Sequence, residues 1–175
     1  MRLNNIDVAQ LETAVRTAKA GTKNTRMVQK VPVEWQTAEG APQFRSIASY
    51  AGGQLVMETD MSKDMGGGGL LPGPMRFAFF GLAASYAGAF AQAVSLMGLE
   101  LHQFTLTVEA PMNMARTYGA SDAPIFEEVR FTISVKSNAS KEQLAQAQSL
   151  ALERAPGVYA LRAPLKVTSQ LEVIA

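Results

Sequence analysis

The sequence predicts an α+β fold, in which antiparallel strands pack around a few helices, and three observations support this prediction. Two segments, 102–108 and 129–135, alternate apolar and polar residues with the period of a half-buried strand. A third segment, 77–99, carries no charge over 23 residues and suits a buried helix. Strands are expected in runs instead of alternating singly with helices, which is typical of α+β domains.

The composition fits one soluble domain and excludes several kinds of chemistry. The 16 Lys and Arg nearly balance the 15 Asp and Glu, so charge gives no reason to expect binding to nucleic acid or to an anionic membrane. Apolar residues reach 47%, and homo-oligomerisation is a natural way to cover them. The absence of cysteine excludes disulfides, thiolate nucleophiles and zinc–thiolate sites in these residues. The first residues show no signal-peptide pattern, so we expect a cytoplasmic protein.

The first 22 residues predict an amphipathic helix appended to a single domain over 23–175. Asn5 is the expected N-cap, and Gly21 lies just past the expected end. Apolar residues recur at helical spacing: Val8, Leu11, Val15 and Ala18.

Three strands are expected next. The first, 28–36, contains Pro32 and is therefore predicted to be an edge strand. The second and third, 44–50 and 55–59, flank a predicted hairpin turn at Gly52-Gly53. Four glycines then indicate a mobile loop, since no Lys-Ser/Thr pair follows to make a phosphate-binding loop.

The uncharged segment is long enough to cross a bilayer, but its composition favours a core helix. It is rich in alanine and glycine, and amphipathic strands of soluble type follow at once. Small or polar residues form a stripe at steps of four and three, which allows another backbone to approach closely. The stripe contains Gly81, Ser85, Gly88, Gln92 and Ser95.

The second half of the chain predicts two strands, a helix and a final strand. Ser140 and Gln143 form a capping box that begins the helix, and Pro156 ends it. Residues 165–173 alternate again and predict the last strand.

Catalytic groups are scarce. His102, the one histidine, is expected on the apolar face of its strand as a core residue, so no general base accompanies Ser85. No cluster of His, Asp or Glu has the spacing of metal ligands, and we expect neither a metal nor another cofactor.

Four stretches together resemble a known family. They are, in chain order, FRSIASYAGGQLVMETD, GPMRFAFFGLAASYAGAFAQAVSLMG, FTISVKSNASKEQLAQAQSLALERAP and LRAPLKVTSQLEV. Over most of 27–173 the chain resembles the OsmC/Ohr proteins, osmotically inducible protein C and the organic hydroperoxide resistance proteins. The resemblance implies an OsmC-like fold, an intertwined homodimer whose antiparallel sheets wrap around long central helices, with an extra N-terminal helix in this chain. It also implies a link to oxidative stress.

The resemblance places the family's reactive groups on residues that lack their chemistry. The peroxidatic cysteine corresponds to Ser85, the resolving cysteine to Ala155 and the glutamate after the helix-opening proline to Met75, while Arg45 is the best match for the arginine. A serine hydroxyl is hardly ionised near neutral pH and cannot follow the oxidation chemistry of sulfur. Thiol peroxidase activity is therefore excluded for these residues acting alone.

The leading hypothesis is a non-catalytic, OsmC-like homodimer with a small apolar ligand in the degenerate crevice. Its ligand-binding residues would be Met75, Ser85, Tyr86 and Arg45. One alternative is an enzyme of another class that uses Ser85 or His102. The other is a structural or partner-binding module that uses its N-terminal helix as the contact.

Overall fold

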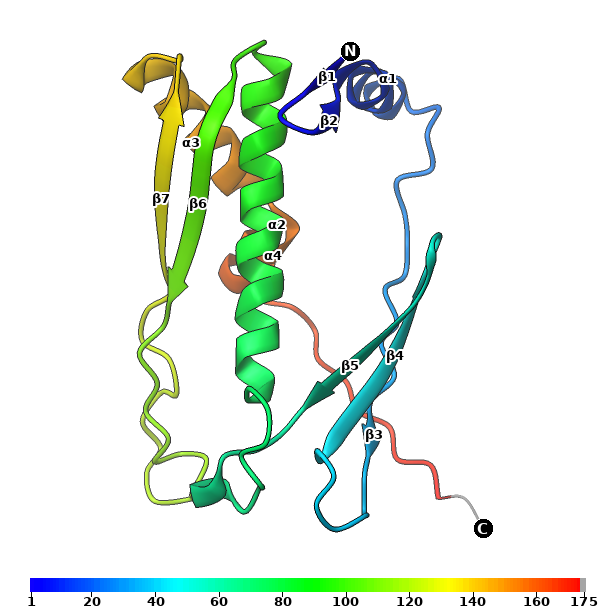
Figure 1. Ribbon diagram of the computed structural model, residues 1–175, viewed down its shortest axis with the longest axis vertical. Coiled ribbons are helices and arrows are strands. Elements are labelled where there is room, and N and C mark those ends of the chain that lie inside the picture. The colour runs from blue at the N-terminus through cyan, green and yellow to red at the C-terminus, as the bar shows by residue number, and fades with distance from the viewer. Residues whose placement is uncertain (174–175) are drawn as a thin grey trace. The chain divides into compact units, whose positions relative to one another are not determined.

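The computed structural model describes residues 1–173 (Figure 1) and divides the chain into two compact units. We call Met1–Glu12 together with Leu82–Ala175 the core unit, and Thr13–Gly81 the sheet unit. Helices α1 and α2 each run from one unit into the other. The units are described separately below.

The core unit begins with a two-stranded hairpin. β1 (Arg2–Leu3) pairs antiparallel with β2 (Ile6–Asp7), and Asn4 and Asn5 form the turn with φ of 51° and 63°. Asparagine tolerates this left-handed conformation better than most residues, which suits it to the tightest hairpin turns. The predicted N-cap at Asn5 is therefore wrong, because Asn5 belongs to this turn.

Helix α1 (Val8–Lys19) follows the hairpin directly. Asp7 caps it by accepting a hydrogen bond from the Gln10 backbone N–H at 3.1 Å. The helix confirms the predicted amphipathic segment. The division into an appended segment 1–22 and a domain 23–175 stays a prediction.

Asn4 ties the hairpin to the rest of the core unit. Its side-chain amide donates to the Ser95 hydroxyl at 3.0 Å and to the Leu99 carbonyl at 2.9 Å, and its oxygen accepts the Leu101 N–H at 2.8 Å. These bonds satisfy backbone groups at the end of one helix and the start of a strand. The first residues are thus part of the core unit's hydrogen-bonding scheme.

The hydrophobic core lies in the core unit, where α2 (Pro74–Leu96) presents one face to α3 (Lys141–Arg154), α4 (Pro156–Arg162) and a two-stranded sheet. The buried α2 side chains recur every fourth residue, as one face of a helix requires. The core consists of Tyr86, Phe90, Val94, Ala147, Ala151, Ala155 and Val158. The alanines allow α3 to approach closely.

β6 (Leu101–Glu109) and β7 (Arg130–Ser137) form the antiparallel sheet of the core unit and confirm two predicted strands. Alternate side chains, such as Phe104 and Phe131, pack against the core. An irregularity in the pairing between Leu101 and Gln103 breaks the alternation. His102 is consequently exposed, and the prediction that it lies on the apolar face is wrong.

The capping box is confirmed: the Ser140 hydroxyl accepts the Gln143 N–H, and the Gln143 side chain accepts the Ser140 N–H. Pro156 ends α3 as predicted, but it also opens α4 at the first helical position, where its missing N–H is harmless. The predicted last strand is wrong for the single chain, because residues 163–173 pair with no other strand.

The sheet unit contains β3 (Glu34–Trp35), β4 (Phe44–Tyr50) and β5 (Gly53–Thr59) in that spatial order, all antiparallel, followed by the short helix η1 (Lys63–Met65). The predicted strand 28–36 shrinks to two residues. The hairpin turn lies at Ala51 and Gly52, one residue earlier than predicted, because Tyr50 pairs with Gly53.

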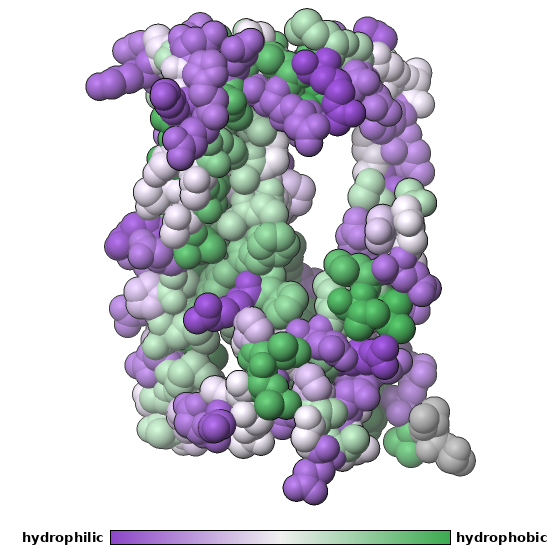
Figure 2. All heavy atoms as spheres, viewed as in Figure 1, coloured by the Kyte–Doolittle hydropathy of each residue, from purple (hydrophilic) through white to green (hydrophobic). Residues whose placement is uncertain are grey.

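Among the described residues, α2 is the one helix long and apolar enough to cross a membrane. Core helices of soluble proteins meet the same criterion, so α2 alone is weak evidence for a membrane span. The composition of α2 predicts a helix that is buried all round, but in the structure only part of its surface is buried. Within the core unit Ala84, Gly88 and Gln92 remain exposed, and Figure 2 shows pale green, weakly apolar atoms along α2. In the single chain α2 is buried on one face.

Candidate functional site

The predicted site residues fall in both units, so the structure describes two places. Ser85, Tyr86 and Ala155 belong to the core unit, whereas Arg45 and Met75 belong to the sheet unit.

Ser85 lies on α2 opposite the start of α4. Its hydroxyl oxygen accepts the backbone N–H of Gly157 at 3.0 Å. The first N–H groups of a helix have no partner within it, so Ser85 caps α4 from another element. Among the hydrogen bonds of the described residues, none links Ser85 to a histidine or a carboxylate. The hydroxyl therefore has a structural partner and no general base.

The contact between α2 and α4 is close. A Cβ atom on Gly157 would lie 3.2 Å from the Cα of Leu82 and 3.2 Å from the Cβ of Ser85. Glycine at this position lets the backbone of α4 reach the helix. Ala155 is fully buried at the junction of α3 and α4, two residues away. The structure thus brings Ser85 and Ala155 to one packed junction within the core unit.

Tyr86 is a core side chain that reaches an open groove. It is 2% exposed, and its ring meets that of Phe131 edge to face, with centroids 5.2 Å apart. Burial raises the pKa of the Tyr86 phenol, and a hydrogen bond with Gln148 offsets part of that rise. The phenol therefore stays protonated near neutral pH. The groove, of about 470 Å³, is also lined by Arg130 and Leu152.

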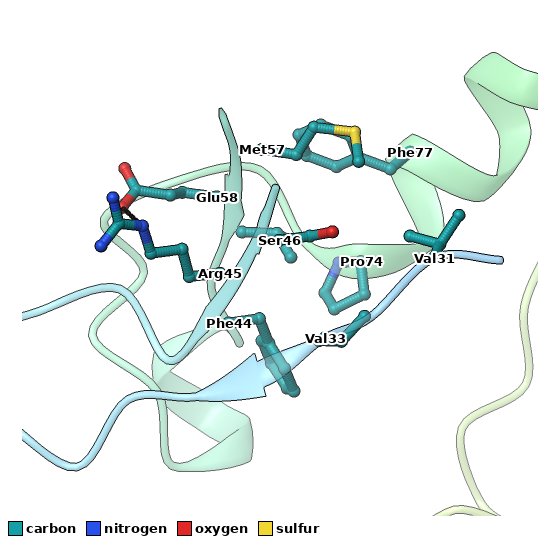
Figure 3. A pocket seen from close by; sticks show the side chains of 10 residues that line it. Val31, Val33, Phe44, Arg45, Ser46, Met57, Glu58, Pro74 and Phe77 are labelled. Carbon is teal, nitrogen blue, oxygen red and sulfur yellow. Dashed lines mark ion pairs between the residues drawn. The ribbon is translucent and has the colours of Figure 1, made fainter. Parts of the chain in front are cut away.

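The sheet unit contains an apolar cavity of about 340 Å³ (Figure 3). It lies between one face of the β4–β5 hairpin, the extended segment before β3 and the start of α2. Its apolar lining comes from Val31, Val33, Phe44, Met57, Pro74 and Phe77.

Strand register decides which side chains of the hairpin belong to this cavity. Ser46 pairs with Met57, and Arg45 pairs with Glu58. Because successive side chains of a strand point to opposite faces, the second pair lies on the other face. Figure 3 shows Arg45 and Glu58 directed away from Phe77, joined by an ion pair at 3.9 Å. Arg45 reaches the cavity's edge, with its charge directed to the exposed face.

The two hydroxyl groups of the cavity's lining donate their protons elsewhere. Ser46, 8% exposed, donates to the Pro32 carbonyl at 2.6 Å, and Thr59 donates to the Pro72 carbonyl at 2.5 Å. Each hydroxyl has a single proton to donate, so both are occupied. The cavity therefore presents mainly apolar walls.

Met75 follows Pro74 in the first turn of α2 and is 38% exposed. It is not among the residues that line the cavity. Its role in ligand binding stays a prediction, as do the ligand-binding roles of Ser85, Tyr86 and Arg45.

Sequence reasoning missed Asp60, whose side chain is fully enclosed. The carboxylate accepts the backbone N–H groups of Leu70 at 3.0 Å, Met61 at 3.0 Å and Gln43 at 3.4 Å. The hydrogen bond from Leu70 is the main reason why the pKa of Asp60 is lowered, and burial opposes it. An aspartate directly after a predicted strand and ahead of a glycine run is the signal that could have identified it.

The glycine loop is consequently tied down, although its composition predicts a mobile segment. Asp60 holds both ends of residues 61–70. A Cβ on Gly67 would lie 2.1 Å from the Met61 carbonyl oxygen, so the loop folds back tightly on its own start.

Comparisons with known proteins agree on one fold. Residues 66–170 match the family model described as OsmC-like protein. An OsmC-like protein from Mycoplasma pneumoniae is 15% identical with a TM-score of 0.54, over 78% of this chain and 89% of that chain. A hypothetical protein from Aquifex aeolicus is 13% identical with a TM-score of 0.55, over 78% of this chain and 89% of that one.

A third similar structure is an organic hydroperoxide resistance protein OsmC from Legionella pneumophila. It is 16% identical with a TM-score of 0.50, over 78% of this chain and 92% of that chain. At these identities the structures show a shared fold. A sequence search of curated proteins gives no significant match.

Proposed function

The chain belongs to the OsmC-like protein family, and from that premise we propose that it is a member without thiol peroxidase chemistry that binds a small apolar ligand. The observation that carries the proposal is the apolar cavity of about 340 Å³ in the sheet unit. Its volume lies at the small end of the range of about 300–1,000 Å³ that is typical of ligand pockets.

The absence of cysteine supports the non-peroxidase part of the proposal. Peroxide reduction by a thiol needs a thiolate that becomes a sulfenic acid, and the sequence holds none. Ser85 stands where the resemblance places the reactive cysteine, and its hydroxyl caps α4. Hydroperoxide resistance, named for the Legionella protein, would need other chemistry in this chain.

The lining of the cavity suggests a neutral ligand. Six of its residues are apolar, and its two hydroxyl groups already donate to backbone carbonyls. Arg45 reaches only the cavity's edge, and its charge is directed to the opposite face of the hairpin and paired with Glu58, so an anionic group deep inside the cavity would lack a counter-charge. A compact hydrocarbon or aromatic molecule matches these walls.

Titration with the neutral fluorescent probe N-phenylnaphthylamine tests the proposal. We expect saturable binding, and we expect Val33→Asp to weaken it by about tenfold or more, because a charge in the apolar lining must stay hydrated. Val28→Asp is the matched control, since Val28 lies on the same extended segment, is 92% exposed and does not line the cavity. The proposal fails if the probe does not bind or if both variants weaken binding equally.

We further propose that the chain acts as an intertwined homodimer in the cytoplasm. Large apolar side chains of the sheet unit remain exposed, among them Trp35 at 58% and Leu55 at 55%. Figure 2 shows deep green, strongly apolar atoms over the β4–β5 hairpin. Residues 165–173 carry apolar residues at alternate positions, at 165, 167, 171 and 173, and have no strand partner. A second copy would cover the apolar side chains and pair with this segment.

Light scattering after size-exclusion chromatography measures the oligomeric state. We expect a dimer for the full chain and a monomer when residues 164–175 are removed. A full chain that elutes as a monomer at micromolar concentration contradicts the homodimer and leaves the ligand proposal to its own titration.

A further inference from the structure

We infer that Met57 is a redox-sensitive site, whose oxidation by hydrogen peroxide to the sulfoxide closes the apolar cavity to its ligand. The inference rests on the proposed ligand binding and adds a means of regulating it. Met57 is the one sulfur-containing side chain among the ten residues that line the cavity.

Register places the Met57 thioether in the cavity. Met57 pairs with the buried Ser46, on the hairpin face that is covered, and is itself half-buried. Figure 3 shows its sulfur on the side of the cavity where Phe77 lies, away from Arg45 and Glu58. Because the Met57 residue is half-buried and lines an open-sided cavity, a molecule as small as hydrogen peroxide can reach its side chain.

The oxidation changes the side chain from apolar to polar. A lone pair of the thioether sulfur attacks one oxygen of hydrogen peroxide, the O–O bond breaks, and an S–O bond forms. The sulfur is oxidised by two electrons, the peroxide is reduced, and water leaves with the remaining oxygen and both protons. A methionine sulfoxide reductase reverses the change with electrons from thiols.

The two hydroxyl groups of the cavity's lining are not free to donate to the new oxygen. A sulfoxide oxygen is a strong hydrogen-bond acceptor, and leaving it unpaired in apolar surroundings is unfavourable. The Ser46 and Thr59 hydroxyl protons are already given to the carbonyls of Pro32 and Pro72. Arg45 reaches the cavity's edge, but its guanidinium group is directed to the opposite face of the hairpin, where it pairs with Glu58. The oxygen is satisfied only by water that enters the cavity, and that water competes with an apolar ligand.

The full chain and its Met57→Leu variant, each treated with hydrogen peroxide, test the inference. Leucine keeps the approximate volume and cannot be oxidised, and the other eight methionines of the sequence stay as internal controls. Peptide mass spectrometry measures sulfoxide at each methionine. We expect oxidation to weaken binding of N-phenylnaphthylamine by about tenfold or more in the natural chain and to leave the variant unchanged. Methionine sulfoxide reductase should restore binding.

Two outcomes overturn the inference. One is Met57 that stays unoxidised while the exposed Met1 and Met27, at 82% and 78%, are converted. The other is an equal loss of binding in Met57→Leu. If the untreated chain does not bind the probe, the proposed ligand function fails. The oxidation of Met57 is then tested separately by two measurements, its sulfoxide yield and the thermal unfolding midpoint. Oxidation should lower that midpoint more in the natural chain than in the Met57→Leu variant.

Discussion

The two units of this chain are stabilised in different ways. The hydrophobic core of the core unit is built from apolar side chains of α2, α3 and α4, with Phe90 and Val94 at 1% and 0% exposure. The sheet unit, all of whose residues the structure describes, encloses two side chains, and both are polar: Ser46 and Asp60. Both units have well-paired strands, so secondary structure does not distinguish them. The difference lies in what is removed from water.

This contrast indicates where stability resides and where a partner would act. Burial of apolar surface is the dominant favourable contribution to folding, and the core unit has most of it. The sheet unit relies on backbone pairing and on the hydrogen bonds that Asp60 accepts, while many of its apolar side chains face solvent. Under the homodimer that we propose, the sheet unit would gain most from the second copy.

Removal of a phenyl ring from each unit should give the largest difference. Phe90→Ala removes a ring that is 1% exposed and lies 5.0 Å from that of Phe104, so we expect a loss of about 3–5 kcal/mol in the free energy of unfolding. Phe80→Ala removes a ring that is 73% exposed and should cost less than about 0.5 kcal/mol. Urea unfolding at low protein concentration measures both. Equal losses would contradict the contrast between the units.

Asp60→Asn should destabilise the sheet unit in a pH-dependent way. The amide keeps the shape but loses the charge, and its NH₂ group faces backbone N–H groups that need an acceptor. Because the folded-state pKa of Asp60 lies below its ordinary value of 3.8, its contribution is present above about pH 3.8 and disappears as pH falls through the folded-state pKa.

The free energies of unfolding of the natural chain and Asp60→Asn, measured between pH 7 and pH 2, give the comparison. We expect a gap that is constant at neutral pH and narrows in acid. A gap that does not change with pH would mean that the carboxylate charge has no part in holding the glycine loop.

Local patterns predicted the elements that have their own local signals. The alternation in β6 and β7 and the capping box at Ser140 appear where the sequence places them. These features depend on neighbours within a few residues. The prediction for His102 failed because an irregularity in strand pairing at the start of β6 shifts the alternation of side chains. The residue types in this part of the sequence do not predict that irregularity.

The candidate site was harder to predict because it depends on distant partners. The bond from Gly157 to Ser85 spans 72 residues, and Asp60 reaches Leu70 across the glycine loop. The predicted strand 165–173 has the right pattern but no partner within one chain. The alternation of apolar and polar residues indicates that a segment suits a strand. It does not indicate which other strand will pair with that segment.

Two glycine substitutions probe close packing within the core unit. Gly157→Ala should cost about 1–3 kcal/mol of unfolding free energy, because the new methyl group meets the backbone of Leu82 at 3.2 Å. Gly88→Ala has no atom within 4 Å and should stabilise the single chain by up to about 1 kcal/mol, since alanine favours a helix. The fraction of dimer, measured at several protein concentrations, gives a second comparison. If Gly88→Ala lowers that fraction, a backbone segment of the second copy packs against α2 at Gly88.

The smallest expected difference between the two units comes from deleting one hydroxyl group in each. Ser85→Ala leaves the Gly157 N–H at the start of α4 without its acceptor in a partly buried place, and we expect a loss of about 1 kcal/mol in the free energy of unfolding. Ser46→Ala removes the donor to the Pro32 carbonyl, but Pro32 lies in an exposed segment where water replaces the bond, so the loss should be smaller. Thermal unfolding at one protein concentration compares the two. If Ser46→Ala costs more than Ser85→Ala, water does not replace the lost bond to the Pro32 carbonyl. The Ser46 hydroxyl would then contribute to the stability of the sheet unit, as buried apolar side chains contribute to that of the core unit.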